Sequence, residues 1–152
     1  MSESIGQVSI PSDHDGFVLL QCPLCGEFFK IKPEDYYADD VLEVWCPSCG
    51  LKSNNYFTDD VHELVGKKAM NFVEDYIYGE MKKMEKKLKG GVISLKVNNK
   101  PKHLEERPIL AGVEALEIFK YPCCKREAKI KTLYKICGSY CPFCGVRYDE
   151  YR

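Results

Sequence analysis

The sequence CPLCG at residues 22–26 and its near copy CPSCG at residues 46–50 decide the fold of the first part of this chain. In each copy two residues separate the cysteines, and the glycine that follows can take the positive φ that closes the turn. Both thiolates of such a turn face one point, where backbone N–H groups stabilise them. Two turns complete a tetrahedral site. We therefore predict a zinc ribbon over residues 17–57, whose zinc ligands are Cys22, Cys25, Cys46 and Cys49.

A second zinc ribbon is predicted over residues 113–152, because this part of the chain repeats the first ribbon. CGEFFKIK, starting at Cys25, aligns without a gap with CKREAKIK, starting at Cys124, and CPSCG aligns with CPFCG at residues 141–145. The repeat places Tyr121 where the first ribbon has its first cysteine, so the fourth ligand must come from elsewhere. The three ligands that the repeat assigns are Cys124, Cys141 and Cys144.

Two cysteines are candidates for that fourth ligand, Cys123 and Cys137. If the ribbon is a plain hairpin that turns at residues 132–133, Cys137 lies about 13 Å from the site along its strand, which favours Cys123. Binding through adjacent cysteines needs a kinked backbone, which Pro122 can set. Gly138 could instead allow the chain to loop Cys137 back toward the metal. The sequence leaves both assignments open.

The cysteine content raises the question of disulfides, since nine cysteines in 152 residues also occur in secreted disulfide scaffolds. The first residues, MSESIGQVSIPSDHDG, lack the charged and apolar segments of an export signal, and no apolar run is long enough to span a membrane. We therefore expect a cytoplasmic protein with two zinc ions per chain and no membrane partner. Because paired CPxCG turns also hold iron in rubredoxins, a rubredoxin-like iron protein is a remote alternative.

Between the ribbons, residues 58–90 are predicted to form one long amphipathic helix. Apolar residues recur there at intervals of three and four, and glycines end the segment after a lysine-rich last turn. About thirty residues at 1.5 Å each give roughly 45 Å, more than a small ribbon can cover. The apolar stripe must therefore meet a partner protein, a fold-back of residues 92–119 or, the option we favour, a second copy in a homodimer. The residues expected at this interface are Val61, Val65, Phe72, Val73, Tyr76, Ile77 and Met84.

The expected fold class is a small α+β protein in which one long helix joins two zinc ribbons of short antiparallel strands. Residues 1–16 are expected to be a flexible tail, and residues 91–112 a strand at 92–97 followed by a linker. A third strand of the first ribbon is expected at residues 41–45. Each ribbon is too small to fold by burial alone, so each is expected to fold on its own zinc ion.

The formal net charge of −1 hides an uneven distribution of charge. Residues 1–63 carry twelve acids and three lysines or arginines, whereas residues 64–152 carry eleven acids and nineteen lysines or arginines. Such a split is typical of two halves that bind different partners or each other. The residues predicted to contact nucleic acid lie on the second ribbon and are Lys125, Arg126, Lys129, Lys131 and Lys135.

The chain resembles the small bacterial proteins described as transcription factor IIB-type zinc ribbon-containing, and the stretch from Tyr121 to Gly145 carries the resemblance. The resemblance implies a role near transcription. The second site lacks the first CxxC pair of the general initiation factor, and the chain has no cyclin-like repeats, so that particular role is not expected.

No catalytic pattern accompanies the cysteines: the sequence has no glycine-rich phosphate loop, no HExxH and no nucleophile elbow, and four thiolates close the first site. We therefore expect no enzyme. The hypothesis is a non-catalytic zinc-binding adaptor or scaffold that dimerises, or docks on a protein partner, through its long helix. The alternative is a transcription-related zinc ribbon protein that binds nucleic acid.

Overall fold

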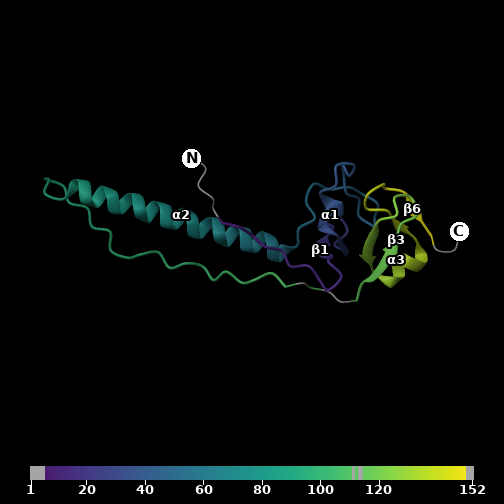
Figure 1. Ribbon diagram of the computed structural model, residues 1–152. Coiled ribbons are helices and arrows are strands. Elements are labelled where there is room, and N and C mark those ends of the chain that lie inside the picture. Colours follow the sequence, from purple (N-terminus) through teal and green to yellow (C-terminus); the bar gives the residue numbers. More distant parts are fainter. Residues whose placement is uncertain (1–5, 111, 113–114, 150–152) are drawn as a thin grey trace. The chain divides into compact units, whose positions relative to one another are not determined.

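The computed structural model describes residues 6–110, 112 and 115–149, and the chain divides into two units (Figure 1). The ribbon unit joins Ile10–Asp59 to Ile109–Arg152, and the helix unit joins Met1–Ser9 to Asp60–Pro108. Both ribbons predicted from the sequence fall within the ribbon unit. The expectation of two separate ribbon domains is therefore corrected. Among the described residues, no helix is both long enough and apolar enough to cross a membrane.

A four-stranded antiparallel sheet forms the centre of the ribbon unit. β1 (Val18–Gln21) pairs with β2 (Phe28–Ile31), β3 (Glu117–Lys120) pairs with β4 (Glu127–Ile130), and β2 pairs with β4. Each ribbon thus contributes one hairpin, and the two inner strands join the hairpins.

The two hairpins are related by an approximate two-fold axis. Lys30 lies opposite Lys129 in the β2–β4 register, and these two lysines occupy the same position in the two repeats. A two-fold axis exchanges equivalent residues of the two repeats. Since Lys30 and Lys129 are equivalent and lie directly opposite each other, the axis passes between them.

Both ribbons share one hydrophobic core. The buried side chains of the core come from β1 and β2, from β4, and from the segments around the cysteines. Three cysteines belong to it as well, so the core reaches the metal-binding turns. A ribbon taken alone would expose the core side chains that pack against the other ribbon, which explains why the two ribbons pack together. Its main members are Leu20, Phe29, Ile31, Val44, Tyr56, Tyr121, Ala128, Ile130 and Phe143.

The turn that begins at Asp13 is tightly held, in contrast to the flexible tail predicted for residues 1–16. Asp13 Oδ1 accepts hydrogen bonds from the backbone N–H of Asp15 at 3.1 Å and of Phe17 at 3.0 Å. The Phe17 side chain is fully buried. The prediction of a tail is therefore wrong for this turn, while residues 1–5 lie outside the described residues.

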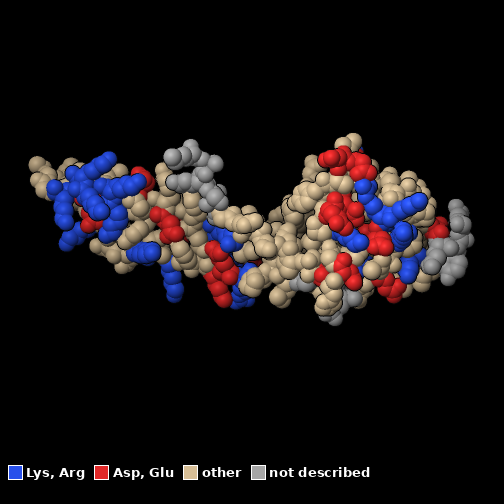
Figure 2. Space-filling model, viewed as in Figure 1, with Lys and Arg blue, Asp and Glu red and all other residues tan. Residues whose placement is uncertain are grey.

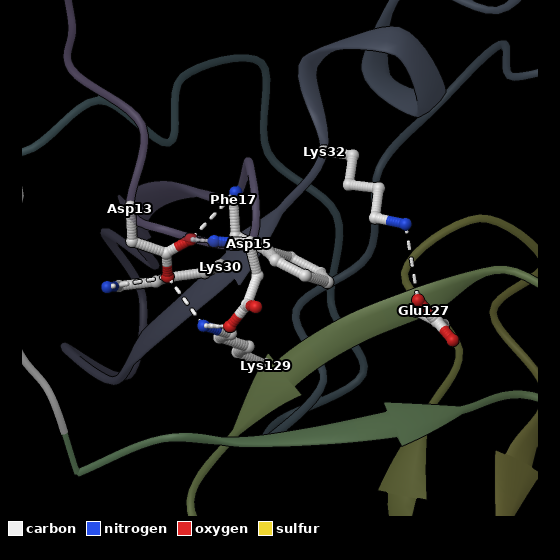
Figure 3. A network of polar contacts seen from close by, with 7 residues as sticks. All are labelled: Asp13, Asp15, Phe17, Lys30, Lys32, Glu127 and Lys129. Carbon is white, nitrogen blue, oxygen red and sulfur yellow. Dashed lines mark hydrogen bonds and ion pairs between the residues drawn. The ribbon is translucent and has the colours of Figure 1, made fainter.

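The second carboxylate oxygen of Asp13 lies between the side chains of Lys30 and Lys129 (Figure 3). Asp13 Oδ2 is 3.2 Å from Lys30 Nζ and 2.7 Å from Lys129 Nζ. Two lysines directly opposite each other in an antiparallel pair repel. The Asp13 carboxylate lies between the two ammonium groups, and Asp15 Oδ2 lies 2.7 Å from Lys129 Nζ, so two negative charges offset the two positive ones and allow the two ribbons to form one sheet. A further ion pair, between Nζ of Lys32, the residue after β2, and Oε2 of Glu127 in β4 at 3.2 Å, also links the two ribbons (Figure 3).

The long helix is present as predicted, as α2 (Asp59–Leu88). The strand expected at residues 92–97 is not formed, because this segment pairs with no strand in the described part of the chain. The segment that follows instead runs back beside α2, to which it is joined by polar contacts. In one of these, Asn71 Nδ2 donates to Leu104 O at 3.1 Å, and Leu104 N donates to Asn71 Oδ1 at 2.8 Å.

Short elements complete the ribbon unit and correct two smaller predictions. The third strand expected at residues 41–45 is reduced to an isolated bridge between Trp45 and Lys52. The hairpin turn expected at residues 132–133 is the start of a short helix instead. The remaining elements are α1 (Pro33–Tyr36), α3 (Thr132–Cys137), β5 (Ser139–Tyr140) and β6 (Arg147–Tyr148), of which β5 and β6 form a second sheet.

Candidate metal centres

The first candidate metal centre is formed by Cys22, Cys25, Cys46 and Cys49, whose sulfur atoms all lie within 4.8 Å of one another. The Sγ atoms of Cys22 and Cys49 are 3.8 Å apart, and those of Cys25 and Cys46 are 3.6 Å apart. Four thiolates about 2.3 Å from a central ion, at the corners of a tetrahedron, would be about 3.8 Å apart. The sulfur positions therefore fit a single four-coordinate ion, and all nine cysteines are free of disulfide bonds.

The same two backbone hydrogen bonds close each turn of this centre. In the first turn Gly26 N donates to Cys22 O at 2.9 Å, and Cys22 N donates to Glu27 O at 2.9 Å. In the second turn Gly50 N makes the equivalent bond to Cys46 O at 2.9 Å. The two glycines have φ of +77° and +72°, a conformation that a residue with a Cβ rarely takes. The sequence prediction of this turn is confirmed.

The second candidate centre is formed by Cys123, Cys124, Cys141 and Cys144, with all four sulfur atoms within 4.8 Å of one another. The Sγ atom of Cys124 is 3.9 Å from that of Cys123 and 3.6 Å from that of Cys141. Cys137 is not part of this group and is exposed at the end of α3. Of the two candidates that the sequence left open, the structure thus places Cys123 at the centre.

Cys123 lies in a turn that has the same backbone hydrogen bonds as the other cysteine turns, although the first residue of this turn is Tyr121 and not a cysteine. Tyr121 N donates to Arg126 O at 2.9 Å, and Lys125 N donates to Tyr121 O at 2.8 Å, as in the other turns. Lys125 takes the place of the glycine, with φ of +59°. The Tyr121 side chain is buried, and its hydroxyl lies 2.6 Å from Ser139 Oγ. Because a buried ring fills the usual ligand position, the sulfur comes from the exposed tip of the turn.

The two centres are linked to each other through backbone hydrogen bonds. Trp45 N donates to Pro142 O at 2.9 Å, and Tyr140 N donates to Pro47 O at 2.9 Å. Trp45 and Tyr140 each precede a CPxCG turn, so the two bonds are equivalent under the approximate two-fold axis. Each metal-binding turn therefore accepts a backbone hydrogen bond from the residue that precedes the other turn.

Two ring contacts repeat this reciprocal arrangement. A Cβ atom added to Gly50 would lie 2.8 Å from the Tyr140 ring, and one added to Gly145 would lie 2.9 Å from the Trp45 ring. These contacts were not predicted from the sequence. The signal for them was present, since an aromatic residue precedes the CPxCG turn in both ribbons.

Burial affects the thiols that a metal would have to deprotonate. It raises the pKa of the Cys46 and Cys141 thiols well above their ordinary value, and it raises the pKa of Cys144 to about 11. Without a metal these sulfur atoms are therefore protonated at neutral pH. A bound cation would displace the protons, so metal affinity is expected to fall as the pH falls.

The basic residues predicted to contact nucleic acid are mostly engaged within the ribbon unit, where acidic and basic side chains lie side by side (Figure 2). The Arg126 side chain is 3.3 Å from Asp35 and 2.7 Å from Asp40. Of the five predicted residues only Lys125, which is exposed, forms no ion pair with another residue in the described part of the chain. The acidic and basic parts of the chain thus meet each other, which the charge distribution had left open. The other pairs are Lys129 with Asp13 and Asp15, Lys131 with Glu27, and Lys135 with Glu117.

The residues predicted at the interface of the helix are divided by their exposure. Val61 is buried, so its assignment to an interface is wrong, and Phe72 is partly buried. The five others are between 48% and 56% exposed and remain available, namely Val65, Val73, Tyr76, Ile77 and Met84.

Comparisons with known proteins give no match to this chain. The resemblance to transcription factor IIB-type zinc ribbon-containing proteins therefore rests on the cysteine turns and remains a prediction. The geometry alone defines the site as two groups of four cysteines that could each hold a metal ion. No family model, no curated protein and no solved structure matches the sequence or the fold.

Proposed function

We propose that the protein is a non-catalytic zinc-binding adaptor, in which two zinc ions hold the ribbon unit together and α2 binds protein. Each group of cysteines provides four sulfur ligands at tetrahedral spacing, which is typical of structural zinc sites. A catalytic zinc keeps one position open for water or substrate, and four thiolates leave none.

The exposed apolar surface of α2 is the observation that carries the adaptor role. Apolar side chains of this helix are at least 40% exposed along most of its length. A continuous apolar surface of this kind marks a site of interaction, because its exposure to water is unfavourable. The residues concerned are Val65, Met70, Val73, Tyr76, Ile77, Met81 and Met84.

The transcription-related alternative is supported by the resemblance and by the lysines at the end of α2, which are Lys82, Lys83, Lys86 and Lys87 (Figure 2). The ion pairs of the ribbon unit count against it, because they occupy the cations that would contact phosphate. We therefore favour a protein partner.

Metal analysis tests the identity of the ions. Protein purified without added metal is expected to contain two zinc ions per chain and to be colourless, measured by elemental analysis and visible absorption. Iron with strong visible absorption would support the rubredoxin-like alternative. A single ion per chain would contradict the second centre.

Affinity capture from cells tests the adaptor role, with and without nuclease. The wild type and Leu133→Glu, a control that places the same charge at an exposed apolar position of α3, are expected to recover the same protein. Ile77→Glu is expected to lose it, because a charge on the apolar surface opposes burial. Recovery that nuclease abolishes, and that Ile77→Glu leaves unchanged, would support nucleic acid as the partner instead.

A further inference from the structure

A continuous apolar stripe follows one face of α2. It consists of Met70, Val73, Ile77, Met81 and Met84, and Leu88 extends it toward the end of the helix. At about 100° per residue, all of these side chains fall within an arc of about 80°. The first five are between 40% and 54% exposed. The stripe is therefore narrow, long and open in the described part of the chain.

The fold-back segment lies on a different side of α2 and does not take up the stripe. His103 Nε2 is 2.8 Å from Asp75 Oδ2, Lys68 Nζ is 2.9 Å from Glu106 Oε2, and Lys82 Nζ donates to Val97 O at 3.3 Å. Together with Asn71, these helix residues are centred roughly 150° around the helix from the stripe. The polar face of α2 thus binds the fold-back segment of the same chain, and the apolar face is left for another molecule.

The stripe is symmetric about Ile77. Val73 and Met81 lie four residues before and after it, and Met70 and Met84 lie seven residues before and after it. When two such helices pack antiparallel with Ile77 at the centre, Val73 of each faces Met81 of the other, and Met70 faces Met84. A two-fold interface requires a surface that is complementary to itself in this way.

The charges of α2 favour the antiparallel direction. From Asp59 to Asp75 the helix has five acidic residues and two lysines, a net charge of −3. From Tyr76 to Leu88 it has two acidic residues and four lysines, a net charge of +2 (Figure 2). Antiparallel packing brings the acidic half of each helix beside the basic half of the other, whereas parallel packing would bring like charges together.

We propose that a second copy of this chain covers the stripe, with the two α2 helices antiparallel and Ile77 at the two-fold axis. This rests on the proposed function, because it names the protein that the helix binds. The dimer has one apolar seam along the stripes. It leaves the fold-back contacts of each copy intact.

Light scattering on the zinc-loaded full chain tests the pairing. The wild type and Leu133→Glu, a control that places the same charge at an exposed apolar residue of α3, are expected to have twice the chain mass of 17.5 kDa, and Ile77→Glu is expected to have the single mass. Glutamate forms helices well, so Ile77→Glu should keep its helical circular dichroism and zinc content. A wild type that stays monomeric up to about 1 mM, or an Ile77→Glu variant that is as dimeric as the wild type, would overturn the proposal.

Cross-linking tests the direction of the helices, in a Cys137→Ser background that removes the exposed thiol outside the two centres. Differently tagged Met70→Cys and Met84→Cys chains are mixed and oxidised. Antiparallel packing is expected to give the mixed dimer and little of either self-linked dimer, because the two Met70→Cys thiols would be about 21 Å apart. Self-linked dimers of each variant would show parallel packing and overturn the proposal.

The two proposals fail in different ways. If the purified wild type is monomeric but still captures another protein through Ile77, the second copy is wrong and the adaptor role stands. If the protein is an antiparallel dimer without bound metal, the pairing stands and the zinc-binding adaptor is wrong.

Discussion

Asp13 is the residue on which the junction of the two ribbons most depends. The Lys30 side chain that it contacts is only 4% exposed, and Lys129 lies on the other side of the same carboxylate. Burial alone would raise the pKa of Asp13, but hydrogen bonds from Lys129, from the Phe17 N–H and from Lys30 outweigh it and hold this pKa well below its ordinary value. Asp13 is therefore ionised at neutral pH.

Replacing Asp13 by asparagine is expected to destabilise the ribbon unit by about 3 kcal/mol, because it leaves the charge of Lys30 buried without a partner. The control is Asp15→Asn, which removes a more exposed carboxylate from Lys129 and should cost less than about 1 kcal/mol. Denaturant unfolding of the zinc-loaded variants measures both. Equal losses would contradict the role of Asp13 at the axis.

The contribution of Asp13 should depend on pH in one direction. Since its pKa is lowered in the folded state, its stabilisation is complete above the unfolded value of about 4 and is lost as the pH falls through the folded value. The difference in unfolding free energy between the wild type and Asp13→Asn should therefore be constant from about pH 8 to pH 5 and shrink only below about pH 4. A difference that shrinks already near neutral pH would contradict this assignment.

Cys123 and Cys137 allow a direct test of the second centre. Cys123→Ser removes a sulfur ligand and is expected to release zinc from this centre, whereas Cys137→Ser should retain two zinc ions per chain. Elemental analysis of the purified variants distinguishes them. Loss of zinc from Cys137→Ser alone would reverse the assignment.

The elements that could be predicted from the sequence are those specified by residues close together in the chain. The spacing of apolar residues and the terminal glycines gave α2 within one or two residues of its observed bounds. The cysteine turns were equally clear, because their hydrogen bonds lie within six residues. Alternation at residues 92–97 gave a wrong strand, since a strand needs a neighbour that local sequence does not reveal. Cys123 was favoured from a hairpin that does not exist, as α3 occupies its turn.

The reciprocal contacts between the metal-binding turns can be tested with glycine substitutions. Gly50→Ala and Gly145→Ala would place a Cβ against the Tyr140 and Trp45 rings, whereas at Gly26 no atom lies within 4 Å of the new Cβ. All three glycines have positive φ, so each substitution costs about 1–2 kcal/mol of backbone strain. The first two should cost about 1–3 kcal/mol more from overpacking.

Denaturant unfolding of the three glycine variants provides the comparison. The losses for Gly50→Ala and Gly145→Ala should exceed the loss for Gly26→Ala. Equal losses of unfolding free energy in all three variants would show that the aromatic rings move aside at no cost, and that these contacts do not couple the two centres.

At the scale of the whole molecule, the sequence indicated two ribbons but not their fusion. Each set of cysteines is visible in its own repeat, whereas the β2–β4 pairing joins residues about one hundred positions apart. The pairing is also electrostatically unfavourable by itself, because it places Lys30 opposite Lys129. The compensating Asp13 lies in a segment with no periodic pattern. Fusion of the ribbons therefore required the tertiary structure.

The shared core implies that the two candidate metal centres fold as one unit, and native mass spectrometry of a single ligand variant tests this. Cys25→Ser disrupts the first centre, and with it β2 and the chain that carries Trp45 into the second centre. Cys137→Ser, outside both centres, should keep two zinc ions and serves as the control. We predict that Cys25→Ser loses both zinc ions. Retention of one zinc ion at full occupancy, in a second ribbon that stays folded, would contradict the claim.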